Sequence, residues 1–75
     1  MIKFSSHSKR RRILYNLTEE DVIKVITGGE RKAIDEDRVT FIGHVENSDL
    51  PIKVICKVIK NDLLVISNYP LTKRQ

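Results

Sequence analysis

The spacing of apolar residues changes along the chain, from a helical period in the first third to a strand-like alternation afterwards. Residues 2–4 read apolar, polar, apolar, which predicts a short first strand. Ser5 or Ser6 then offers a helix N-cap, and the following stretch predicts a helix to about Tyr15. The chain is therefore expected to begin with one strand and one helix.

A second helix is predicted after Thr18, a typical N-cap residue. Three acidic residues follow and favour the positive end of the helix dipole. Val22, Val25 and Ile26 recur at helical spacing, so one face of this helix is apolar. The glycine pair at positions 28–29 predicts its end.

The remainder of the chain has the pattern of strands. It is weak at residues 32–35 and strong at residues 38–45, where apolar side chains alternate with others. Residues 47–49 predict a turn. Two further strands are predicted at residues 52–59 and 63–69, and the short connection between them makes an antiparallel hairpin.

Two registers of this hairpin are compatible with the sequence. A two-residue turn at residues 61–62 places Tyr69 opposite Val54, whereas a three-residue loop at residues 60–62 places it opposite Lys53. We favour the second register, because it separates apolar from polar positions more cleanly. Its apolar face consists of Val54, Cys56, Val58, Leu64 and Ile66, and its polar face of Lys53, Lys57, Ser67 and Tyr69.

Together these elements predict an α+β fold in a single domain, residues 1–75, with two N-terminal helices packed on one face of a twisted antiparallel sheet of three to four strands. A chain of 75 residues has room for one small core, which buries only about 60% of the surface that the unfolded chain exposes. The second, more polar face of the sheet is left for ligands.

Charge is distributed unevenly along the sequence. Residues 1–17 carry five cations and no acid, residues 18–51 carry four cations and nine acids, and residues 52–75 carry five cations and one acid. The net charge of +4 therefore results from two basic ends, which form one basic pole, and an acidic middle segment. This asymmetry suits an anionic partner such as nucleic acid, although surface charge also serves solubility.

The single cysteine, Cys56, cannot form an intramolecular disulfide, and its apolar neighbours predict a buried, inert thiol. The N-terminus lacks the apolar stretch of a signal peptide, and no apolar run approaches the roughly 20 residues of a membrane span. We therefore expect a cytoplasmic protein that does not contact membranes.

Three short motifs occur in a particular order along the chain. The first combines an aromatic residue, a hydroxyl residue, a histidine, a small residue and an arginine, namely Phe4, Ser5, His7, Ser8 and Arg11. An acid-rich segment at residues 17–22 and a closing segment at residues 65–70, which ends in Tyr-Pro, complete the set. In this order the motifs resemble a family of small prokaryotic domains of unknown function that is allied to RelE/ParE-like toxins and microbial ribonucleases.

The chain departs from that family's pattern at two positions. Tyr15 stands where the family often has a second arginine, which removes a candidate phosphate contact that Arg10 and Arg12 are placed to replace. Asn16 stands where a glycine is common before the second helix.

The resemblance implies a RelE-like fold and a toxin-type, metal-independent endoribonuclease, or a relative that retains RNA binding, with an antitoxin protein as a partner. In that scheme His7 or Tyr69 transfers protons and Arg11 neutralises the phosphate. The other cations predicted to bind RNA are Arg10, Arg12, Lys53, Lys57, Lys73 and Arg74. No cofactor or metal is expected, since the sequence shows no clustered set of metal ligands.

His7 and Tyr69 also have a purely structural interpretation. His7 shares a helix face with Arg11 and Leu14 and can simply pack there, and Tyr69 at a strand end can plug the edge of the core. His44 has no recognisable partner and is assigned a surface or structural role. The alternative functions are a non-catalytic protein-interaction module, a homodimerising domain and a nonspecific nucleic-acid binder.

Overall fold

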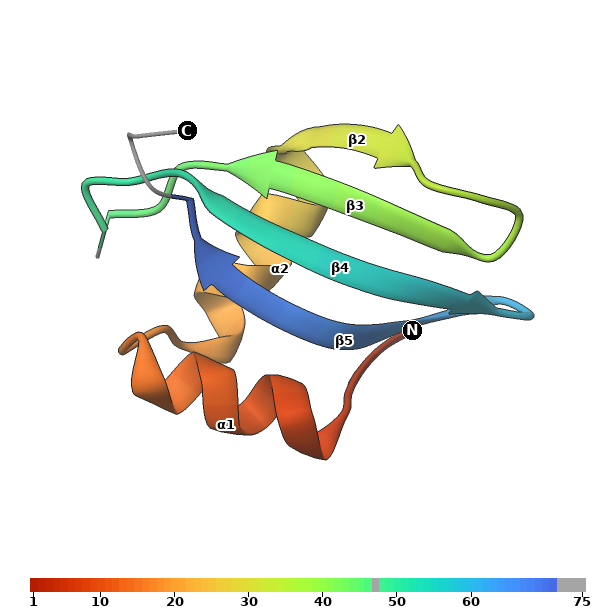
Figure 1. Ribbon diagram of the computed structural model, residues 1–75, viewed down its shortest axis with the longest axis horizontal. Coiled ribbons are helices and arrows are strands. Elements are labelled where there is room, and N and C mark those ends of the chain that lie inside the picture. Colours follow the sequence, from red (N-terminus) through yellow and green to blue (C-terminus); the bar gives the residue numbers. More distant parts are fainter. Residues whose placement is uncertain (47, 72–75) are drawn as a thin grey trace.

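The computed structural model describes residues 1–46 and 48–71, which form two helices and five strands. Figure 1 shows how they are arranged. The helices are α1 (Ser6–Leu14) and α2 (Glu19–Gly28). The strands are β1 (Ile2–Phe4), β2 (Glu30–Ala33), β3 (Arg38–Gly43), β4 (Ile52–Ile59) and β5 (Asp62–Pro70). They make one sheet in the order β1-β5-β4-β3-β2, in which β1 is parallel to β5 and the other neighbours are antiparallel.

The α+β class is confirmed, whereas the predicted sheet of three to four antiparallel strands is wrong in strand number and in direction. The sheet in the described part of the chain has five strands and is mixed. The parallel pair joins residues 2–4 to residues 63–65, and no local pattern in the sequence reports a pairing over so long a separation. The exposed strand β2 is added at the opposite edge by its antiparallel ladder with β3.

Both helices begin at the predicted caps. The Ser5 side chain accepts a hydrogen bond from the Ser8 backbone N–H at the start of α1. Thr18 and Asp21 form a reciprocal capping box, in which Thr18 Oγ1 accepts from the Asp21 N–H at 3.1 Å and Asp21 Oδ2 accepts from the Thr18 N–H at 3.0 Å. A cap of this kind stabilises a helix by about 1 kcal/mol. Between the helices Asn16 has a φ of 58°, a left-handed conformation that asparagine tolerates better than most residues.

The hydrophobic core lies between the helices and one face of the sheet. The apolar face of α2, formed by Val22, Val25 and Ile26, packs on β3 and β4. The buried sheet residues are Val39, Phe41, Ile52, Val54, Cys56 and Val65. Helix α1 packs on the same face. Asn68 lies opposite the buried Val54, so its side chain points to that face, and there it donates a hydrogen bond to Ser8 of α1. The other face of the sheet is covered by neither helix.

The β4–β5 hairpin has a turn that neither predicted register contains, and the favoured register holds only on the far side of a β-bulge. Its turn has two residues, Lys60 and Asn61, since Ile59 pairs with Asp62. Further along, Cys56 pairs with Val65 but Ile55 pairs with Ser67, so Ile66 is an extra residue, a β-bulge. Tyr69 therefore lies opposite Lys53, as the favoured register predicts. The predicted inward positions of Leu64 and Ile66 are wrong, because before the bulge Leu63 and Val65 face the core.

Gly29 lets α2 approach β3. A Cβ atom at this position would lie 2.5 Å from the Val25 carbonyl oxygen and 2.6 Å from the Ile42 carbonyl oxygen. Both obstacles are backbone atoms and cannot rotate away. The neighbouring Gly28 ends α2, and a Cβ there would meet nothing within 4 Å.

We therefore expect Gly29→Ala and Gly28→Ala to have opposite effects on stability. The first forces α2 away from β3 and should lower the free energy of unfolding by roughly 1–3 kcal/mol. The second replaces a poor helix former in open space and should raise it by up to about 1 kcal/mol. Urea unfolding followed by circular dichroism measures both, and equal stability of the two variants would contradict the close approach.

Candidate functional site

The face of the sheet opposite the helices carries cations and half-buried apolar side chains. We call it the open sheet face; its main residues are Lys3, Lys53, Ile55, Lys57, Leu64, Ser67 and Tyr69. These positions alternate with the buried ones along each strand, so they point away from the core. Because antiparallel sheets often leave one face to solvent, the face is available for a ligand.

Tyr69 and Lys53 are direct cross-strand partners on the open sheet face. Both side chains are half-buried, and Ile42 of β3 flanks Lys53 on its other side. Side chains paired in this way have Cβ atoms roughly 4.5–5.5 Å apart. The structure thus places a phenol and an ammonium group, both predicted as site residues, side by side.

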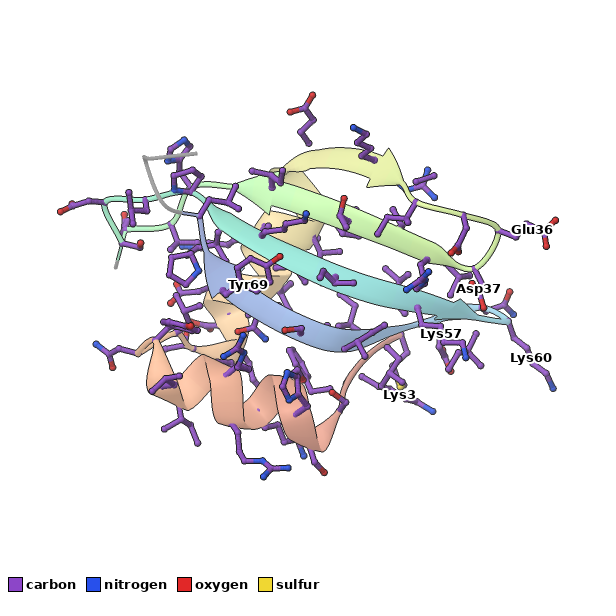
Figure 2. All side chains as sticks on the ribbon, viewed as in Figure 1. Lys3, Glu36, Asp37, Lys57, Lys60 and Tyr69 are labelled. Carbon is purple, nitrogen blue, oxygen red and sulfur yellow. The ribbon has the colours of Figure 1, made fainter. Side chains whose placement is uncertain are left out.

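Lys57 lies further along β4, toward the hairpin turn. It is four positions from Lys53, which corresponds to roughly 13 Å along a strand. Figure 2 shows Lys57 and Lys3 toward one end of the sheet and Tyr69 away from them over β5. The predicted lysines therefore follow the strand and do not converge on one point.

Helix α1 carries His7, Arg10 and Arg11 beside β5 (Figure 1). His7 is exposed in the first turn, and no hydrogen bond or ion pair fixes its imidazole among the described residues. Arg11 is half-buried, with its guanidinium carbon 5.7 Å from the centroid of the Tyr15 ring. Arg10 is exposed. Of the three, Arg11 is the cation that packing holds in place.

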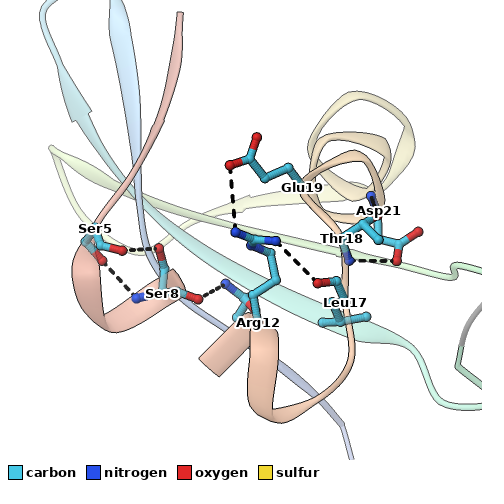
Figure 3. A network of polar contacts seen from close by, with 8 residues as sticks. Ser5, Ser8, Arg12, Leu17, Thr18, Glu19 and Asp21 are labelled. Atoms are coloured by element: carbon cyan, nitrogen blue, oxygen red, sulfur yellow. Dashed lines mark hydrogen bonds and ion pairs between the residues drawn. The ribbon is translucent and has the colours of Figure 1, made fainter. Parts of the chain in front are cut away.

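Arg12 has contacts that connect α1 to the start of α2 (Figure 3). Its guanidinium lies 5.8 Å from the Phe4 ring centroid, donates to the Leu17 carbonyl oxygen at 3.5 Å and is 3.7 Å from a Glu19 carboxylate oxygen. The side chain is only 17% exposed. These contacts give Arg12 a packing role, and its contact with RNA remains a prediction.

Two further cations predicted to bind RNA, Lys73 and Arg74, lie outside the described residues, as does Asn47 of the predicted turn. His44 is exposed, which agrees with a surface role. Lys3 and Arg38, which also flank the open sheet face, are already paired with acids. The amino terminus and Lys3 lower the pKa of Asp62, and Arg38 lowers the pKa of Asp35 to about 2.

Three polar residues between α1 and β5 were not predicted as part of the site. Ser8 and Asn68 are both fully buried, and Asn68 Nδ2 donates to the Ser8 carbonyl oxygen at 3.2 Å. Ser5 Oγ donates to the Ile66 carbonyl oxygen at 3.2 Å. The sequence signal that could have revealed them is Asn68 itself, a polar residue that the favoured register places on the apolar face opposite Val54.

The described part of the molecule presents surfaces and no enclosed site. No pocket was found in it, and no three His, Cys, Asp or Glu side chains are grouped closely enough to hold a metal ion. None of the described helices is long and apolar enough to cross a membrane.

Comparisons of the chain with protein-family models, with curated proteins and with solved structures found no match. The functional argument therefore rests on the residues and their positions.

Cys56 is excluded as a nucleophile by its surroundings. The side chain is fully buried on the core face of β4, and burial raises the pKa of its thiol to about 11. Because the thiolate is the reactive form, very little is present at neutral pH.

We expect native Cys56 to react with a disulfide reagent such as DTNB at pH 8 at least about 100-fold more slowly than the urea-unfolded chain. Absorbance of the released thiol measures both rates on one sample. A native rate equal to that of the unfolded chain would show that the thiol is accessible and would contradict its position in the core.

Proposed function

We propose that this protein is a metal-independent endoribonuclease of the RelE-like kind, with RNA bound across the edge of β5 beyond residue 65, where β1 no longer pairs with it, so that the RNA reaches α1 on one side and the open sheet face on the other. The observation that carries the proposal is the cross-strand pair of Tyr69 and Lys53 on the uncovered face of the sheet. A proton-transferring phenol and a cation are adjacent there, on the strand beside which α1 runs. The packing of two helices on one face of the sheet also supports the RelE-like fold that the sequence resembles.

The proposed reaction needs three groups. The His7 imidazole takes the proton from a ribose 2′-hydroxyl, and the 2′-oxygen then attacks the adjacent phosphorus. Arg11 and Lys53 stabilise the negative charge that develops on the phosphate oxygens. Tyr69 gives its proton to the departing 5′-oxygen. The bond from phosphorus to the 5′-oxygen breaks, and the products are a 2′,3′-cyclic phosphate and a 5′-hydroxyl end.

We expect the purified protein to cleave RNA in the presence of EDTA, with and without ribosomes as separate arms. His7→Ala and Tyr69→Phe should each lower kcat by about 100-fold or more, since each removes a proton-transfer group. Arg11→Ala should lower it by a similar factor through lost charge stabilisation. Gel analysis of labelled RNA gives the rates, and the chemistry of the new ends identifies the mechanism.

Two controls accompany this experiment. Lys24→Ala removes an exposed cation from α2, on the side of that helix away from Val22 and Ile26, and should leave cleavage unchanged. A substrate with 2′-deoxyribose at the cleaved position should be inert, because the nucleophile is missing. Salt-sensitive RNA binding without any cleavage would reduce the proposal to an RNA-binding relative.

A second candidate, a protein-interaction module, is favoured by exposed apolar residues on α1. Ile13 is 73% exposed and Leu14 is 65% exposed, on a helix that contains four cations and no acid. Two copies of so basic a helix would repel each other, which disfavours a homodimer through this surface. An acidic partner such as an antitoxin protein fits it better.

The second candidate predicts that the wild-type protein captures a specific partner and that Ile13→Ser/Leu14→Ser loses it without losing RNA cleavage. Mass spectrometry of matched pull-downs would identify the partner. Identical captures by the two proteins would remove α1 from this role.

A further inference from the structure

The β-bulge in β5 determines which way Tyr69 points. Val65 is fully buried, and strict alternation from it would turn residue 69 toward the helices. The extra residue, Ile66, shifts the alternation by one, so Asn68 enters the buried layer and Tyr69 faces outward beside Lys53. Bulges commonly re-aim a side chain in this way near functional sites.

Helix α1 is attached to the bulge through Ser5. The Ser5 N–H donates to the Val65 carbonyl oxygen at 3.0 Å, and Ser5 Oγ donates to the Ile66 carbonyl oxygen at 3.2 Å. The same Oγ accepts the Ser8 N–H at 3.1 Å as the N-cap of α1 (Figure 3). One hydroxyl therefore caps the helix and also holds the bulged strand.

Asn68 makes a second attachment one turn further along α1. Its amide is fully buried, and Nδ2 donates to the Ser8 carbonyl oxygen at 3.2 Å, while Oδ1 has no hydrogen-bond partner among the described residues. An apolar residue would fill this position, opposite Val54, without desolvating an amide. Core stability alone does not account for the asparagine, whereas a directional bond to α1 does.

We propose that Asn68 and Ser5 are positioning residues that fix where α1 lies along β5. His7 immediately precedes Ser8, the residue that Asn68 binds on α1, and Tyr69 immediately follows Asn68 on β5. The two bonds thereby set the distance between the groups on the helix and the groups on the open sheet face. The catalytic consequence rests on the proposed function, because a displacement of about 1 Å can slow a reaction about 100-fold.

The test compares Asn68→Leu with wild type, and Ser5→Ala with its matched control Ser6→Ala. Leucine keeps the branched shape and the burial but cannot donate to Ser8; Ser6 is exposed at the first position of α1. Residual dipolar couplings of backbone amides report the orientation of α1 relative to the sheet. We expect this orientation to change in Asn68→Leu and Ser5→Ala and to be unchanged in Ser6→Ala.

If wild type cleaves RNA, both positioning variants should lose about 100-fold in kcat while KM changes less than about threefold. An unchanged α1 orientation overturns the inference whatever the activity, and so does a changed orientation with unchanged kcat. If wild type is inactive, the proposed function fails, and the couplings alone then decide the placement of α1. Should Asn68→Leu fail to fold, the smaller Asn68→Ala and the serine pair provide the same comparison.

Discussion

The structure depends on β5, because this strand is paired on both sides and also carries α1. Its pairing with β4 is a local hairpin, but its parallel pairing with β1 joins residues 2–4 to residues 63–65. Ser5, at the end of β1, then starts α1 and binds the bulge. The first motif of the chain is thereby brought against the last, and the proposed site is formed by segments that only the complete fold brings together.

Caps, glycines and apolar spacing predicted the helices and the two hairpin strands well, because these signals act within a few residues. The same signals did not predict the register of β5. The strand begins with two adjacent pairs of apolar residues, so either member of each pair can face the core; the pairs are Leu63 with Leu64 and Val65 with Ile66. The parallel pairing with β1 and the Ser5 hydrogen bond to Ile66 stabilise the register that contains the bulge, and both join residues far apart in the sequence. No periodicity within the strand contains that information.

For the candidate site, the sequence predicted one pair of neighbouring side chains but not the packing of the arginines. Tyr69 and Lys53 are cross-strand neighbours, as the favoured register predicts. Arg12, in contrast, contacts Phe4, Leu17 and Glu19, and the run of three arginines in the sequence does not predict which of them packs in this way. Residue 16 can be explained from the backbone. Asn16 has a positive φ, which glycine adopts freely and asparagine tolerates, so an asparagine is compatible with the turn between the helices.

The proposed function requires RNA to bind to an exposed surface. In that proposal charge supplies the binding, through Lys53 and Lys57 in a line along β4. Charge alone fixes no distance between a proton-transferring group and a phosphate. In the proposed reaction the scaffold sets that distance, through the buried hydrogen bond from Asn68 and the part-buried hydrogen bond from Ser5 across the α1–β5 interface. An apolar interface of the same size would hold α1 on the sheet by packing alone, without the directional bonds to Ser8 and Ile66.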